Sequence, residues 1–197
     1  MKKFLAFITI FFLISNVTFA AVDENYFNGD KNYIYCGASM GAGYFVDRSS
    51  LIVEKYNPPI YVISIDVLSA GHYYDNNSLA KLGRRYTERF LYDYLTKKMY
   101  YYTPNDGGKY MRSRYENNYR GRNDKFSKEK LKMIDEIDWN SDWTLIDPDV
   151  FYGEGAVFPT VGEIAFALAY NLKFYGSNYQ RFKGNFYDKI GNIKDNL

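Results

Sequence analysis

The chain has 197 residues, with 25 basic side chains, 23 acidic side chains and one cysteine. A lone cysteine excludes an internal disulfide, so the fold must be held by its own hydrophobic core, which a chain of this length can supply. The balance of charges argues against a broad basic surface, and we therefore expect no nucleic-acid partner.

Residues 1–20 have the pattern of a cleavable export signal. Lys2 and Lys3 precede an apolar run at 4–14, and the small residues Thr18 and Ala20 stand three and one positions before a predicted cut. The run is too short to span a bilayer, and no cysteine follows it to carry a lipid. We expect a secreted, periplasmic or cell-surface protein without an integral membrane segment after cleavage. Since the signal holds two lysines and no acid, the remaining domain has equal numbers of basic and acidic residues.

Strands are predicted through the first half of the domain. Short extended segments are expected at 33–36 and 44–53, with the glycines at 37, 41 and 43 forming a bulge or turn between them. The clearest strand is 61–67, where Tyr61 and the apolar residues at 63, 65 and 67 share one face at period two. A hairpin follows, with alternation at 89–94, a turn at 95–98 and a second strand at 99–102. Hairpins of this kind build an antiparallel sheet.

Helices are predicted late in the chain. Ser127 begins a short apolar repeat that ends near Ile137. The stronger pattern covers 161–175, where Thr160 and Glu163 match a capping box and Gly176 provides a stop. We read residues 21–176 as one α+β domain, an antiparallel sheet packed against a C-terminal amphipathic helix, with 177–197 as a loose extension or late strand.

One string resembles a catalytic motif. Gly37 to Gly41 reads G-x-S-x-G, which in a hydrolase would present Ser39 as a nucleophile, with His72, the single histidine, as its base. The motif lies close to the expected mature N-terminus, and an extended segment follows where the motif needs a helix. We therefore expect a domain that is not an enzyme. No ligand spacing predicts a metal or a cofactor, and Cys36 lies in an apolar segment that favours a buried, inert thiol.

Tyrosine is abundant, with 22 residues in the chain. Tyrosine combines a large contact area with a polar tip, which suits binding surfaces, although strands also favour aromatic residues for packing. Both interpretations are kept open at this point. The candidate binding residues are the tyrosines of the predicted hairpin and the Arg- and Tyr-rich segment after it: Tyr92, Tyr100, Tyr102, Arg112, Arg114, Tyr115 and Tyr119.

Several of these segments together resemble the surface-adhesin protein E family of bacterial secreted proteins. The resemblance rests on the export signal, the run at 44–50 (YFVDRSS), the strand at 61–68 and the hairpin from Arg89 to Tyr100. It implies an antiparallel sheet with helical support and a role in binding at the cell surface. This chain departs from the family in having one cysteine where a pair is expected.

The sequence thus predicts an exported bacterial domain that binds a protein or a cell-surface ligand. Two alternatives are a small secreted serine hydrolase using Ser39 and His72, and a small outer-membrane barrel suggested by the size and the aromatic content. The predicted helix at 161–175 uses chain that such a barrel would need.

Overall fold

The computed structural model describes residues 25–39, 41–71, 81–102, 142–149 and 157–194. Within these residues, seven strands form one open antiparallel sheet in which each strand pairs with the next along the chain. The strands are β1 (Tyr26–Phe27), β2 (Asp30–Ser39), β3 (Ala42–Asn57), β4 (Ile60–Gly71), β5 (Leu82–Asp93), β6 (Lys98–Tyr102) and β7 (Trp143–Leu145).

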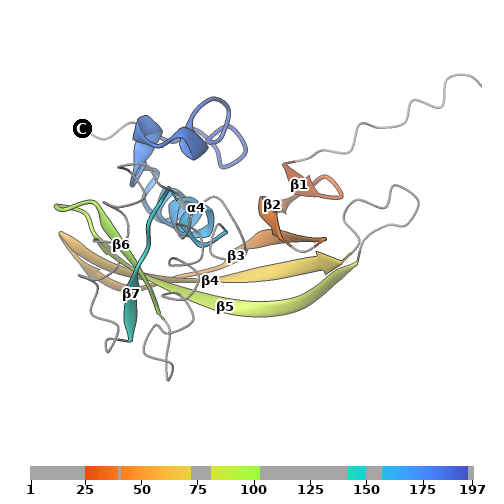
Figure 1. Ribbon diagram of the computed structural model, residues 1–197, viewed down its shortest axis with the longest axis horizontal. Coiled ribbons are helices and arrows are strands. Elements are labelled where there is room, and N and C mark those ends of the chain that lie inside the picture. The colour runs from red at the N-terminus through yellow and green to blue at the C-terminus, as the bar shows by residue number, and fades with distance from the viewer. Residues whose placement is uncertain (1–24, 40, 72–80, 103–141, 150–156, 195–197) are drawn as a thin grey trace, which may run out of the picture.

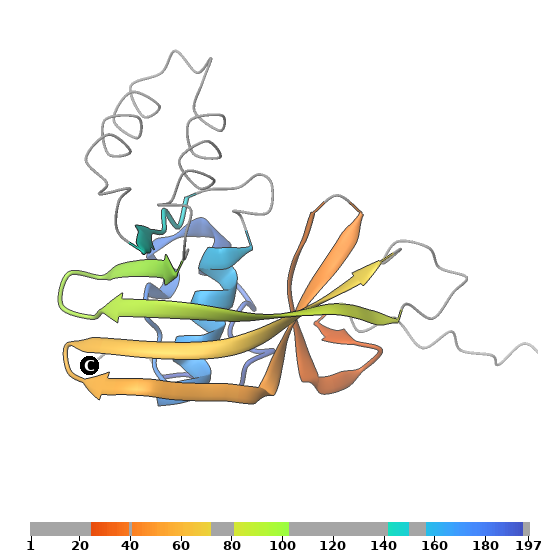
Figure 2. The same ribbon diagram turned by 90° about the horizontal axis from the view of Figure 1, so that it is seen from below.

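One helix and two short turns complete the described fold. The helix α4 (Phe158–Tyr170) and the 3-10 turns η2 (Gly176–Asn178) and η3 (Gln180–Phe182) follow the sheet in the chain. They all lie against the same side of the curved sheet, with α4 crossing behind its long strands (Figures 1 and 2). The molecule is therefore the single α+β domain that the sequence predicts.

The alternation of β4 creates the main core. Ile63, Ile65 and Val67 are buried in the cluster that includes Val161 and Ile164 of α4. The other face of β4 carries Ser64 and Asp66, as the period of two requires, but Val62 and Leu68 on that face are also buried. A second small cluster of Phe27, Phe45 and Ala70 packs at the end of the sheet near β1.

The predicted hairpins form where the turn residues place them. Tyr92 pairs with Met99, and Oδ1 of Asp93 accepts hydrogen bonds from the backbone N–H groups of Leu95 and Thr96, each at 3.1 Å. Between β2 and β3, the register shifts from Tyr35 to Gly37, where Gly37 has a φ of 148°. Only glycine adopts this conformation at little cost, so the glycine run serves a bulge and a hairpin, as expected.

The C-terminal helix differs from its prediction at both ends. It begins at Phe158 with Pro159 in its first turn, and its N-cap residue Val157 makes no side-chain capping bond. It ends at Tyr170, because Asn171 adopts a left-handed conformation with a φ of 56° and donates its N–H to the Ala167 carbonyl. The capping box is not formed, since Glu163 faces the interior.

The tail is not a loose extension in its described part. Phe174, Phe182 and Tyr187 belong to the main core, and η2 and η3 fold this segment back over α4. The aromatic residues that look widely spaced in sequence meet because the short turns bring them onto one face. The predicted helix near 127–137 lies outside the described residues.

No helix in the described part of the chain has both the length and the apolar character needed to cross a bilayer.

Candidate ligand pocket

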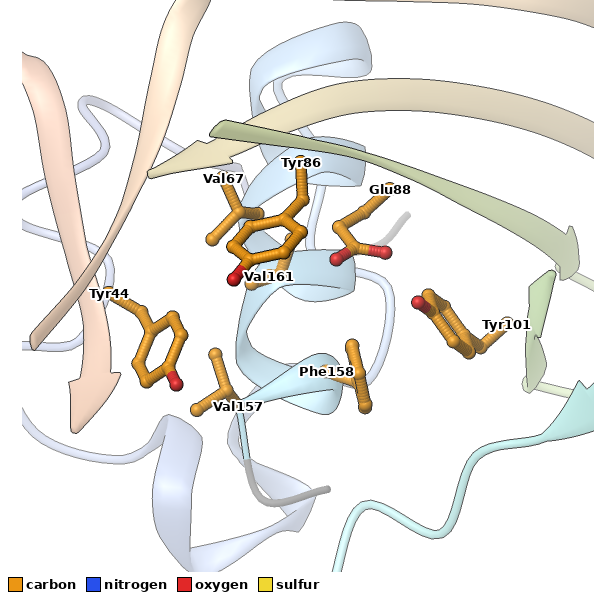
Figure 3. Close-up of a pocket in the computed structure, with 8 residues that line it drawn as sticks. All are labelled: Tyr44, Val67, Tyr86, Glu88, Tyr101, Val157, Phe158 and Val161. Atoms are coloured by element: carbon orange, nitrogen blue, oxygen red, sulfur yellow. The ribbon is translucent and has the colours of Figure 1, made fainter. Parts of the chain in front are cut away.

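A pocket of about 220 Å³ opens between the sheet and the first turn of α4 (Figure 3). Its described lining comes from three neighbouring strands, from β6 and from the helix: Tyr44, Val67, Tyr86, Glu88, Tyr101, Val157, Phe158 and Val161. Four of these eight residues are aromatic and three are valines. The pocket is thus a mainly apolar recess with a single carboxyl group.

The strand period explains how Glu88 enters this recess. On β5, alternate residues face α4, and Glu88 stands between Tyr86 and the buried Phe90 on that face. Val67 pairs with Tyr86 from β4, and Tyr101 approaches from β6 beside Phe90. A charged residue therefore occupies a position where the pattern of its own strand calls for an apolar one.

Burial changes the acidity of Glu88. Loss of hydration raises the pKa of its carboxyl group, and a hydrogen bond with the Tyr101 side chain partly opposes that rise. The Tyr101 ring is in turn stacked on Phe158, with ring centroids 4.2 Å apart. The carboxyl group is consequently held in place by an aromatic wall that joins the sheet to the helix.

Glu163 lies deeper in the molecule, on the same helix that borders the pocket. Both oxygens of its carboxylate accept hydrogen bonds. Its Oε1 accepts hydrogen bonds from the Phe174 N–H at 2.9 Å and the Tyr187 hydroxyl at 2.6 Å, and its Oε2 accepts one from the Tyr175 N–H at 2.9 Å. Burial raises the pKa of Glu163 while these donors oppose the rise. These hydrogen bonds connect the C-terminal segment to α4, so Glu163 has a structural role.

The tyrosines predicted as a binding surface fall on different sides of the sheet. Tyr92 is fully buried under α4 and donates a hydrogen bond of 2.8 Å to the Gly162 carbonyl, so it is a core residue and not part of a surface. Tyr100 and Tyr102 are half-buried and lie on the opposite face, since Met99 and Tyr101 between and beside them point toward the helix.

Tyr102 takes part in a small aromatic cluster on that opposite face. Its ring centroid lies 5.0 Å from that of Trp143, and the Arg89 guanidinium lies 5.2 Å from the Tyr102 centroid and 5.5 Å from the Trp143 centroid. Arg89 also pairs with Glu54 of β3. The remaining predicted residues, Arg112, Arg114, Tyr115 and Tyr119, lie outside the described part of the chain.

The G-x-S-x-G string has no elbow around it. Ser39 ends β2 and pairs with Ala42, and the chain continues directly into β3. A nucleophile elbow needs a strand followed by a helix, so the geometry that exposes the serine in hydrolases is not formed here. His72 lies outside the described residues.

Cys36 behaves as its apolar surroundings predict. Its side chain is buried, and burial raises the pKa of the thiol to about 12. A thiol with this pKa holds almost no thiolate at neutral pH, so it is unreactive in the folded protein. Among the described residues, no group of three or more His, Cys, Asp or Glu side chains could hold a metal ion.

Sequence reasoning missed Glu88, although the sequence carries a signal for it. The alternation that we noted at Phe90 and Tyr92 extends backward through Glu88 to Tyr86 on the same face. An acid inside an aromatic, core-facing series is a mark of either a buried polar network or a site. Only the position of α4 shows which residues close the recess around it.

Comparison with known proteins adds no relative: no family model, no curated protein and no solved structure matches this chain.

Proposed function

We propose that this protein is an exported domain of the bacterial cell envelope that binds a small organic ligand in the pocket between its sheet and α4, without catalysing a reaction. The observation that carries the proposal is the recess itself, with four aromatic rings and one carboxyl group in its lining. Small-molecule sites are typically apolar hollows with a few placed polar groups, and they often lie between secondary-structure layers.

The size of the pocket limits the ligand. Pockets for drug-sized molecules measure roughly 300–1,000 Å³, and this one measures about 220 Å³. It therefore suits a compact molecule or the head of a longer one.

The test is ligand-observed NMR with a panel of small amines, alcohols and acids against the mature domain. We expect compounds that bind to compete for one site. Val161→Phe should abolish binding because the larger ring fills the recess from α4, and Tyr86→Ala should weaken it because an exposed wall is removed. The matched control is Val53→Phe, the same enlargement at an exposed position of β3. Binding that survives both pocket variants, or a panel without any binder, would overturn the proposal.

Export is the second part of the proposal and rests on residues 1–20. We expect the protein recovered from the envelope or medium of an expressing bacterium to begin at Ala21, as shown by intact mass and N-terminal sequencing. Recovery of the full chain from the cytoplasm would contradict this part alone.

A second candidate function is adhesin-like binding through the face opposite α4. The observation that favours it is the Arg89, Tyr102 and Trp143 cluster, because aromatic residues and arginine are enriched at the centres of protein interfaces. Trp143→Ala should reduce binding of the purified domain to surfaces coated with serum or matrix proteins, measured by interferometry. Leu95→Ala, at an exposed turn position, is the control, and equal binding by the two variants would contradict this candidate.

A further inference from the structure

Glu88 is the single charged side chain among the described residues that line the pocket, and no lysine, arginine or histidine stands beside it there. The hydrogen bond with Tyr101 orients the carboxyl group but supplies no positive charge. A half-buried carboxylate such as that of Glu88 is stabilised by an opposite charge, because the surroundings screen the attraction less than water does. The recess is therefore electrostatically complementary to a cation.

The walls favour the same kind of ligand. Tyr86, Tyr101 and Phe158 lie around the Glu88 side chain from β5, β6 and the helix, whereas Tyr44 lies at the far end of the pocket (Figure 3). Aromatic faces attract cations through the negative potential above the ring. Several rings around one carboxylate form the arrangement that recognises ammonium groups.

The first turn of α4 acts in the opposite direction, because a helix N-terminus favours anions. Its effect is equivalent to roughly half a positive charge, whereas an ionised Glu88 places a full negative charge inside the recess. The carboxylate therefore determines that the preferred ligand is positively charged, and an anion would be repelled.

The carbon surface that makes up most of the lining narrows the ligand class further. A primary ammonium group carries three N–H donors that each need a partner when buried, but a methylated ammonium group carries few or none. The lining offers one carboxyl group and three phenol oxygens among carbon surfaces. Methyl groups around a positive nitrogen match this surface better than free N–H groups do.

We propose that the pocket binds a methylated ammonium group, held by the Glu88 carboxylate and the surrounding aromatic rings. This inference rests on the proposed function of the pocket and names its ligand class. The group can belong to a small free molecule or to a lipid headgroup, since both present the same chemistry.

The experiment is calorimetric titration of the mature domain with choline and with 3,3-dimethyl-1-butanol, its uncharged analogue in which carbon replaces nitrogen. We expect choline to bind about tenfold more tightly or better than the uncharged analogue, because only the cation gains the carboxylate and ring interactions. Glu88→Gln should reduce that preference to what the rings alone provide, while Glu54→Gln, the same change on the other side of the sheet, should retain it in full.

The outcomes separate this inference from the pocket function. Equal binding of both compounds, or a preference for choline that Glu88→Gln leaves intact, would overturn the ammonium inference while the pocket remains a ligand site. Failure of choline to bind, both as the free molecule and as a phosphatidylcholine headgroup, also overturns the ammonium inference. The NMR panel then decides separately whether the pocket binds any ligand.

Vesicles of phosphatidylcholine and of phosphatidylglycerol distinguish the two sources of the ammonium group. Binding of free choline indicates a free ligand. Glu88-dependent binding only to phosphatidylcholine vesicles indicates a lipid headgroup.

Discussion

Two glutamates on facing elements, Glu88 half-buried and Glu163 fully buried, show how loss of hydration leads to different roles. Burial raises the pKa of both Glu88 on β5 and Glu163 on α4. Glu163 receives two backbone N–H groups and one hydroxyl from the C-terminal segment. Glu88 instead faces a recess and is hydrogen-bonded to the side chain of Tyr101.

The comparison teaches that a shifted pKa does not by itself identify a site. A carboxylate surrounded by donors from its own chain has its interactions satisfied within the fold, so its removal is felt as lost stability. A carboxyl group that borders open volume can satisfy a ligand, so its removal is felt as lost binding. The three predictions below test this division.

The largest expected effect is the loss of stability when the Glu163 side chain is removed. Glu163→Ala leaves three buried donors without their acceptor, and each unsatisfied group costs about 1–3 kcal/mol. We expect the free energy of unfolding to fall by about 4 kcal/mol, measured by urea denaturation of the mature domain.

The matched control for this prediction is Tyr187→Phe, which removes one donor and keeps the ring in the core. Its cost should be about 2 kcal/mol, since a single hydrogen bond to a carboxylate is lost. A loss of stability for Glu163→Ala no larger than that for Tyr187→Phe would contradict a role for Glu163 as the anchor of the tail.

A smaller effect is expected at Tyr92, which lies in the same core but outside the pocket. Tyr92→Phe removes the hydrogen bond to the Gly162 carbonyl and should lower the free energy of unfolding by about 1 kcal/mol. Binding of pocket ligands should be unchanged, as measured by the same titration. Tyr101→Phe provides the comparison, because it removes the hydrogen bond to Glu88 and should alter binding.

The smallest expected effect is the pH dependence that Glu88 contributes. Because its folded pKa is raised above the ordinary value of 4.5, the folded state binds the proton more tightly than the unfolded state does. The stability that this proton provides is complete below pH 4.5 and is lost as the pH rises through the folded pKa. Glu88→Gln has no such loss.

The stability of Glu88→Gln relative to the unsubstituted protein should therefore increase with pH across this window, measured by urea denaturation at a series of pH values. A difference between Glu88→Gln and the unsubstituted protein that stays constant from acid to neutral pH would place Glu88 in water and remove the basis for a desolvated site.

Local sequence patterns predicted much of the fold. The period of two at 61–67 gave the correct buried face of β4, and the alternation at 89–94 with the turn at 95–98 predicted the β5–β6 hairpin. The apolar neighbours of Cys36 predicted its burial. These features depend on residues within a few positions of one another, so they can be read without knowing the fold.

The candidate site could be predicted only in small part. Tyr100 and Tyr102 were grouped with Tyr92, yet the strand period sends them to the face opposite α4. Glu163 matched a capping box but turned inward, because donors from residues 174, 175 and 187 offered it a better environment than the helix end. Local patterns cannot show such partners, since they arrive from a tail that folds back.

The sequence by itself determined an α+β domain with an antiparallel sheet, because backbone pairing and side-chain period act over short stretches of chain. The tertiary structure alone decided which carboxyl group is satisfied and which borders a recess. That choice depends on where α4 and the C-terminal turns cross the sheet. The crossing brings Glu88, Tyr101 and Phe158 together from distant parts of the chain, and this contact, more than the abundance of tyrosine, defines the candidate site.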